Sequence, residues 1–98
     1  MAGTGRGSTP RQQVLGDRIK QRRHDIGLSQ EALANKAAIN RTYIGSLETG
    51  ERNPALDTLA RLAKALDCDL GDLVAGLQDL PGRNDPPPAS KQRRKASR

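Results

Sequence analysis

Aromatic residues are almost absent from this sequence: it contains no Trp, no Phe and a single Tyr, and only 34% of its residues are hydrophobic. Any core must therefore be built from Leu, Ile, Val and Ala, a composition that favours a small all-helical domain over a β-sandwich. A chain of 98 residues has room for one domain. We predict an all-α fold.

Chemically reactive and metal-binding patterns are also scarce. The single cysteine, Cys68, cannot form an internal disulfide and has no CxxC or His partner for a metal. We find no paired acid–base constellation and no phosphate-binding loop, and we therefore predict no metal, no cofactor and no enzymatic activity. No apolar run has the length of a signal peptide or approaches the roughly 20 residues of a membrane span. We expect a cytoplasmic protein that has no membrane partner.

The net positive charge is confined to the two ends of the chain. The formal net charge is +6, which suggests a polyanionic partner. Residues 12–80, however, contain nine basic and ten acidic side chains, whereas residues 81–98 carry a net +5. Net charge by itself therefore does not establish nucleic-acid binding.

Composition divides the chain into three parts. Residues 1–9 are rich in Gly, Ser and Thr, and we expect a disordered tail there. Residues 81–98 contain three consecutive prolines and many basic residues, which predicts a second disordered tail. This basic tail is either an arm that follows DNA phosphates or a solubilising extension. The folded domain is expected to span residues 10–80.

Apolar residues at helical spacing predict five short helices within this domain. Short helices are marginal on their own, so the five must share one core. Asp69 and Asp72 resemble a capping box, whereas Ala55 offers no capping hydroxyl. We place the helices at Pro10–Asp25, from Ser29 to just before Ile39, from the cap Asn40 to about Glu48, at Ala55–Leu66 and from about Asp69 onward.

The second and third predicted helices are joined by only about three residues, centred on Ile39. Such a tight connection forces the two helices to cross steeply, as in a helix-turn-helix, here spanning residues 29–47. Ile44 and Leu47 then point into the core, while Arg41, Thr42, Gly45 and Ser46 lie on the opposite face. This short polar face suits the major groove of DNA, which admits one helix.

The run GLSQEALANKAAINRTYIGSLETGERNPALDTLARLAKAL resembles the XRE family, the Cro/CI-type helix-turn-helix of lambdoid phage repressors. Within that family it is most similar to the controller proteins of restriction–modification systems. The resemblance covers about residues 12–76. It implies a compact five-helix, lambda-repressor-like domain that binds DNA.

The resemblance also implies a role for individual residues. Arg41 at the helix start has the reach to bind guanine O6 and N7 with two parallel bonds, which supports its role. Tyr43 either contacts a phosphate or covers a corner of the core. The implied roles are base contacts for Arg41, Thr42 and Ser46, backbone contacts for Gln30, Asn40, Tyr43, Arg52 and Asn53, and a structural ion pair for Arg23 and Glu48.

One recognition helix reads too few base pairs to define a site, so we expect a homodimer on a pseudo-palindromic operator. Residues 54–80 carry two basic and five acidic side chains and should face away from DNA. Four leucines at the end of the domain are predicted to form the dimer contact: Leu70, Leu73, Leu77 and Leu80.

The function predicted from the sequence is that of a transcriptional regulator that binds double-stranded DNA in a sequence-specific manner. RNA polymerase is a candidate partner of such a regulator. Two alternatives use the same fold: the DNA-binding antitoxin of a toxin–antitoxin pair, whose partner is a toxin, and a coactivator-type module that bridges proteins. The polar face formed by Arg41, Thr42 and Ser46 argues against the coactivator.

Overall fold

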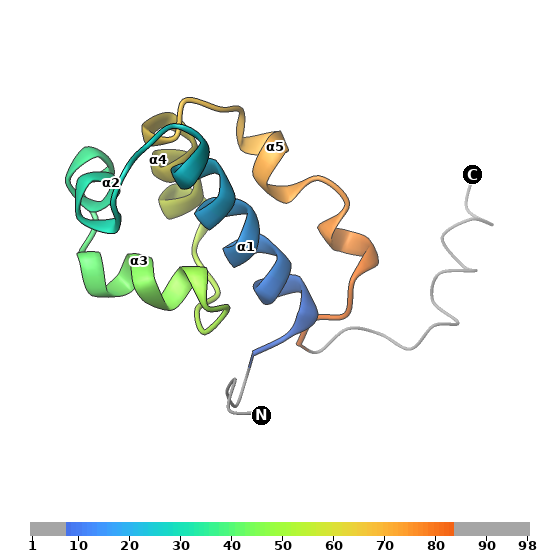
Figure 1. Ribbon diagram of the computed structural model, residues 1–98. Helices are drawn as coiled ribbons and strands as arrows, with labels where there is room; N and C mark the ends of the chain where they lie inside the picture. Colours follow the sequence, from blue (N-terminus) through green and yellow to red (C-terminus); the bar gives the residue numbers. More distant parts are fainter. Residues whose placement is uncertain (1–7, 84–98) are drawn as a thin grey trace.

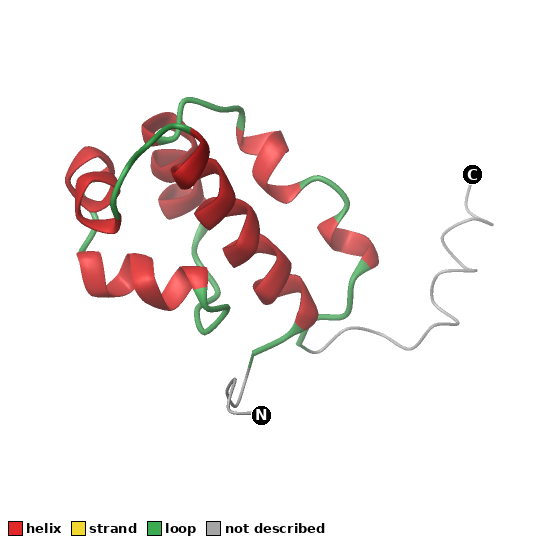
Figure 2. Cartoon of the chain, in the orientation of Figure 1, coloured by secondary structure: helices red, strands yellow, loops and turns green. Residues whose placement is uncertain are grey.

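The computed structural model describes residues 8–83, which form five α-helices and one short 3₁₀ helix, with no strand among these residues (Figures 1 and 2). The all-α prediction is confirmed. The long first helix crosses the middle of the domain, and the others surround it. The helices are α1 (Pro10–Asp25), α2 (Gln30–Ala37), α3 (Arg41–Glu48), α4 (Leu56–Ala65), α5 (Leu70–Val74) and the 3₁₀ helix η2 (Leu77–Asp79).

The corner between α2 and α3 is built by local caps. Ser29 Oγ accepts a hydrogen bond from the Ala32 N–H at 3.0 Å and so caps α2. Ala38 then takes a left-handed conformation with φ +57°, and the Ile39 N–H donates to the Ala34 carbonyl at 2.9 Å. Asn40 Oδ1 accepts the Thr42 N–H at 2.7 Å and begins α3. The predicted tight helix-turn-helix is therefore confirmed.

The second half of the domain differs slightly from the prediction. Ala55 is the N-cap of α4 and makes no side-chain cap, whereas Asp69 and Asp72 form the capping box that the sequence predicts for α5. The helix α5 has only five residues, and the 3₁₀ helix η2 that follows it was not predicted. Gly76, with φ +76°, provides the turn between them.

The core is made of Leu, Ile and Ala side chains from every α-helix and from η2. Leu73 and Leu77, which were predicted to form a dimer contact, are 2% and 7% exposed and belong to this core. That part of the prediction is wrong, because α5 and η2 fold back against α1 and use these two leucines to close the monomer's own core. Leu70 and Leu80 are half-buried against the same core.

The folded part extends slightly beyond the predicted boundaries. Thr9, assigned to the N-terminal tail, caps α1 by accepting the Gln12 N–H at 3.1 Å. At the other end, the Pro81 carbonyl accepts the Arg11 N–H at 3.1 Å. The remainder of both predicted tails, residues 1–7 and 84–98, lies outside the described residues. Within residues 8–83, no helix is long and apolar enough to cross a membrane.

Candidate nucleic-acid interface

Helix α3 has one buried face and one exposed face. Ile44 and Leu47 are fully buried in the core. Arg41 and Thr42 are exposed on the opposite side, and Ser46 is half-buried beside them. The predicted division of α3 into a core face and a polar outer face is therefore present.

Arg41 is held at the start of α3 by a chain of polar contacts that leads into the protein. Arg41 Nη1 donates to Gln30 Oε1 at 3.3 Å, and Gln30 Nε2 donates to Glu48 Oε1 at 3.0 Å. Because the Glu48 carboxylate only accepts hydrogen bonds, the Gln30 amide must turn its nitrogen toward Glu48 and its oxygen toward Arg41. Gln30 thus connects the first turn of α2 to both ends of α3.

The inner end of this chain is a buried ion pair between α1 and α3. Arg23 Nε donates to Glu48 Oε2 at 2.6 Å, Arg23 Nη2 donates to Glu48 Oε1 at 3.0 Å, and Arg23 Nη1 donates to the Leu28 carbonyl at 2.8 Å. Both side chains are buried. The hydrogen bond to Glu48 raises the pKa of Arg23, although burial of the guanidinium acts in the opposite direction. Arg23 therefore stays charged, and the pair fixes α3 against α1.

A glycine lets α1 approach the end of α3 closely. A Cβ atom at Gly16 would clash with the Leu47 carbonyl oxygen and would lie 2.9 Å from the Glu48 carbonyl oxygen. Only a residue without a side chain fits between the two backbones. The position of the recognition helix is thus set by Gly16 as well as by the ion pair.

The small polar residues of α3 differ in what they can offer to DNA. Ser46 Oγ donates to the Thr42 carbonyl at 3.1 Å, so in this conformation its hydroxyl is available only as an acceptor. The exposed Thr42 hydroxyl has no hydrogen-bond partner within residues 8–83. Asn40 uses Oδ1 as the helix cap, which leaves its amide N–H groups for a further acceptor. The Thr42 hydroxyl is the least committed of these polar groups.

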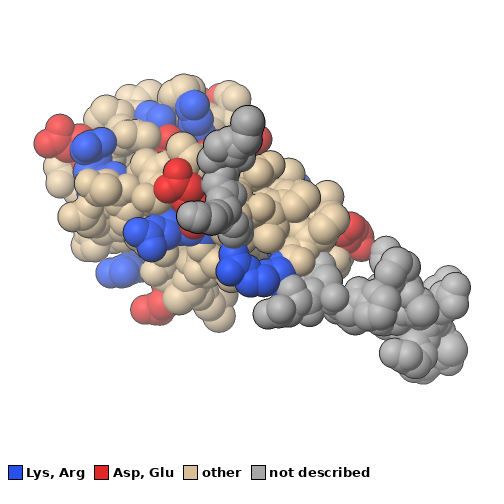
Figure 3. Space-filling view, turned by 90° about the horizontal axis from the view of Figure 1, so that it is seen from below, with Lys and Arg blue, Asp and Glu red and all other residues tan. Residues whose placement is uncertain are grey.

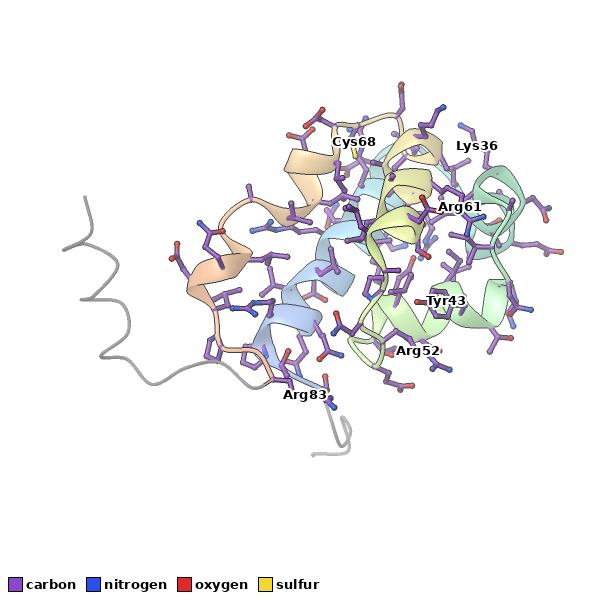
Figure 4. All side chains as sticks on the ribbon, turned by 180° about the vertical axis from the view of Figure 1, so that it is seen from behind. Lys36, Tyr43, Arg52, Arg61, Cys68 and Arg83 are labelled. Carbon is purple, nitrogen blue, oxygen red and sulfur yellow. The ribbon has the colours of Figure 1, made fainter. Side chains whose placement is uncertain are left out.

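The loop after α3 is fixed at its beginning and exposed at its middle. The Gly50 carbonyl accepts from Gln12 Nε2 at 3.2 Å and from Ser8 Oγ at 2.9 Å. Arg52 and Asn53 are exposed, and the Arg52 guanidinium carbon lies 5.5 Å from the centre of the Tyr43 ring (Figure 4). The half-buried Tyr43 also packs against the core.

Sequence reasoning missed Ser8 and Gln12 as anchors of this loop. Gln12 is buried although it is polar, because its amide satisfies a loop carbonyl. A glutamine on the inner face of a helix was the available signal for Gln12. For Ser8 there was none, since its partner lies 42 residues away.

Charges of both signs are mixed on the lower face of the domain. The view from below shows Lys and Arg side chains interspersed with Asp and Glu (Figure 3). The described residues on the face seen in this view are not uniformly basic. Charge on this face therefore does not mark an interface, and the assignment rests on the geometry of α3 and its loop.

One large hydrophobic side chain within residues 8–83 is exposed: Leu56, at 69%. It occupies the first position of α4, directly after the loop that contains Arg52. The sequence did not distinguish this leucine from the other core-spaced leucines of α4.

Cys68 lies away from α3, between α4 and α5, next to Arg22 and Asp72. Burial raises the pKa of its thiol, and the nearby Arg22 guanidinium partly opposes this shift. The thiol is therefore protonated at neutral pH and behaves as a partly buried apolar group.

Comparisons with known proteins agree with this geometry. Residues 19–73 match the family model described as helix-turn-helix. The chain is 42% identical over 72 residues to the control protein C.SmaI of Serratia marcescens, covering 71% of this chain and 86% of that protein. The crystal structure of the restriction-modification controller protein C.AhdI from Aeromonas hydrophila is similar with a TM-score of 0.61 and 39% identity, over 62% of this chain and 92% of that one. The P22 c2 repressor, in complex with a synthetic operator, gives a TM-score of 0.61 and 33% identity, over 65% and 97% of the respective chains.

Proposed function

This chain belongs to the XRE-type helix-turn-helix family of DNA-binding transcriptional regulators, and on that premise we propose that it recognises a two-fold symmetric operator as a homodimer with α3 in the major groove. The observation that carries the proposal is the contact chain from Arg23 through Glu48 and Gln30 to the exposed Arg41. These contacts orient one exposed arginine at the start of α3, which supports its role as a base-reading side chain.

The proposed base contacts are those of Arg41, Thr42 and Ser46. Arg41 at the first position of α3 donates in parallel to guanine O6 and N7, which is the commonest specific contact in the major groove. Thr42 offers a methyl group to thymine or a hydroxyl to either base. Ser46, one turn further on, accepts from a base amine.

The proposed backbone contacts surround these residues. The side chains of Gln30, Asn40, Tyr43, Arg52 and Asn53 lie at the start of α2, at the start of α3 and in the following loop. The N-terminal ends of α2 and α3 also present N–H groups that favour phosphate oxygens. These contacts fix the register of α3 in the groove and carry no base preference of their own.

The proposed dimer contact is centred on Leu56 of α4. Exposure of one large apolar side chain beside the recognition element supports a covered surface there. Asp57 and Arg61 are exposed one turn apart on the same helix, so an antiparallel pair of α4 helices would match Asp57 with Arg61 of the partner subunit. Such self-complementarity is what a two-fold contact requires.

Selection of bound sequences from random double-stranded DNA tests the proposal directly. We expect a pseudo-palindrome whose half-sites are about one helical turn apart. Arg41→Ala should lose about 1–3 kcal/mol of preference for the selected site and retain weak binding to other sequences. Lys20→Ala, which removes one exposed positive charge on α1 away from α3, is the control for loss of charge alone.

Four outcomes would contradict parts of the proposal. An unchanged affinity of Arg41→Ala for the selected site would exclude α3 as the reader. A selection without any motif would favour the coactivator-type module, and co-purification with a neighbouring gene product would favour the antitoxin. A monomeric mass in sedimentation at micromolar concentrations without DNA would contradict the dimer, and Leu56→Glu should give that mass if Leu56 forms the contact.

The basic segment 84–98 is proposed to add affinity without specificity. Its Lys and Arg residues would release counterions from phosphates, so deletion of residues 84–98 should weaken all sequences alike and flatten the salt dependence of binding. An unchanged slope of affinity against salt would assign the segment a solubilising role only. The measurement is a salt titration with the full chain and the truncated one.

A further inference from the structure

The pairing of Tyr43 with Arg52 links the recognition helix to the loop that follows it. Tyr43 is the third residue of α3, and Arg52 lies in the middle of the loop between α3 and α4. The guanidinium carbon is 5.5 Å from the ring centre, within the range of a cation–π contact (Figure 4). We propose that Tyr43 is a positioning residue whose ring orders Arg52 for a DNA phosphate.

The two partners differ in how firmly they are held. The Tyr43 ring is half-buried and packs against the core, and the Tyr43 N–H lies 3.4 Å from Asn40 Oδ1. Arg52 is exposed. Because the Tyr43 ring is fixed and Arg52 is long and exposed, the contact limits the conformational freedom of the Arg52 side chain.

The loop backbone leaves Arg52 without another restraint. The Glu51 N–H donates to the Ser46 carbonyl at 2.9 Å, and Gly50 is held by Gln12 and Ser8. Beyond Glu51, neither Arg52 nor Asn53 takes part in a hydrogen bond within residues 8–83. The Tyr43 ring is therefore the contact that restrains the Arg52 side chain before DNA binds.

The chemistry of the guanidinium group allows the two contacts to coexist. Arginine interacts with aromatic rings through its delocalised cation, whereas its five N–H donors lie in the plane of the group and bind phosphate oxygens from the edge. An ordered side chain also loses less rotamer entropy when it binds. Lysine, with a compact and strongly hydrated ammonium group, would lose much of this advantage.

This role replaces the direct contact of Tyr43 with a phosphate that the proposed function includes. A direct contact needs the phenolic hydroxyl, whereas the positioning role needs only the ring. Tyr43→Phe therefore separates the two: the ring remains and the hydroxyl is lost. Tyr43→Leu keeps an apolar side chain on the core but removes the ring.

The contact itself is tested without DNA. We expect the side-chain proton resonances of Arg52 to carry a ring-current shift in the NMR spectrum of the wild-type protein. The shift should persist in Tyr43→Phe and disappear in Tyr43→Leu, with the amide spectrum confirming that both variants are folded. A random-coil position for the Arg52 protons in the wild type would overturn the proposal, whatever the protein does with DNA.

The consequence for binding rests on the proposed function and is tested with a short random-sequence duplex at low salt, because phosphate contacts do not need the operator. Tyr43→Leu should weaken binding about two- to fivefold per protomer, the equivalent of an exposed cation–π contact. Tyr43→Phe should bind like the wild type. In the Arg52→Ala background, Tyr43→Leu should have almost no additional effect, since the two residues act as a unit.

Two results would overturn the positioning role. One is an equal loss in Tyr43→Phe and Tyr43→Leu, which would assign the effect to the hydroxyl. The other is an undiminished effect of Tyr43→Leu in the Arg52→Ala background. A failure of Arg41→Ala to change specificity would contradict the proposed function, but the result of this cycle would stand independently.

Discussion

The arginines of this domain fall into two sets that differ in where their side chains point and what they contact. The arginines of α1 turn inward and bind main-chain carbonyls, whereas those of α3 and its loop remain exposed and are each held by one weak contact. The inward set is Arg11, which donates to the Leu77, Gln78 and Leu80 carbonyls, Arg18, which donates to Leu73 and Ala75, Arg22, which donates to Leu66 and Asp67, and the buried Arg23. The side chain is the same, and its location decides whether it stabilises the fold or is free for a partner.

The inward set has a physical reason. The last carbonyls of a helix lack intrahelical partners and carry partial negative charge, so a guanidinium is a good cap for them. Arg18 and Arg22 reach the ends of α5 and α4, and Arg11 reaches carbonyls along η2 and at its C-cap Leu80. Three short helices that were marginal alone are thereby tied to α1. The positive charges of these arginines are therefore committed to the fold and are not evidence for a DNA-binding surface.

The largest expected loss of stability comes from removing Glu48, the residue that connects the buried Arg23 to the exposed Arg41 through Gln30. Glu48→Ala leaves Arg23 buried without its partner and removes the acceptor that orients Gln30. We expect a loss of about 3–5 kcal/mol in the free energy of unfolding. Chemical denaturation followed by circular dichroism measures it. Glu51→Ala, which removes an exposed carboxylate three residues later, should stay within about 0.5 kcal/mol of the wild type.

The close approach of α1 to α3 should be nearly as sensitive. Gly16→Ala places a methyl group against the Leu47 and Glu48 carbonyls, which belong to the backbone and cannot rotate away. Overpacking of this kind costs about 1–3 kcal/mol, and α3 must shift to relieve it. Thermal unfolding tests the stability. An unchanged unfolding midpoint would show that α1 and α3 can accommodate a methyl group between them.

The contrast between arginines is sharpened by comparing Arg18→Ala with Arg41→Ala. Arg18→Ala removes bonds to the Leu73 and Ala75 carbonyls at 3.1 and 2.7 Å and should cost about 1–2 kcal/mol of stability, since the group is partly exposed. Its preference among DNA sequences should not change. Arg41→Ala should do the reverse. A loss of DNA preference in Arg18→Ala with an intact fold would contradict the division.

The smallest effect is expected on the exposed face of α3. A Cβ atom at Gly45 would lie 3.9 Å from Gln30 Nε2, an ordinary contact, so Gly45→Ala should stabilise the helix by up to about 1 kcal/mol. If α3 approaches the groove closely at this point, DNA affinity should fall while stability rises. Equal or better binding by Gly45→Ala would show that the position is a neutral part of the surface.

The sequence predicted the helices because their signals are local. Ser29, Asn40 and Asp69 cap the helices that they were expected to cap. The missing cap at Ala55 was also foreseen. By contrast, η2 and the contact of Ser8 lay outside the prediction, because they depend on a partner or a turn that no local pattern encodes. The Thr9 cap was missed although its signal is local, since Thr9 precedes Pro10 and its partner Gln12 lies three residues away.

The candidate site was predictable where it lies within one helix. Helical periodicity alone separates Arg41 and Thr42 from Ile44 and Leu47. The proposed dimer leucines were harder, because a leucine at the end of a domain can pack against its own chain or against another. Leu73 and Leu77 pack against their own chain.

The sequence by itself determined that this chain is helical, where its helices begin, and that α2 and α3 form a tight helix-turn-helix with a polar outer face. Each of these properties follows from neighbours within a few residues. Only the tertiary structure decided which arginines bind the carbonyls at helix ends, that Leu56 is exposed, and that the Arg52 guanidinium lies over the Tyr43 ring. These depend on contacts between residues far apart along the chain, whose geometry exists only once α1 and the helices around it have closed one core.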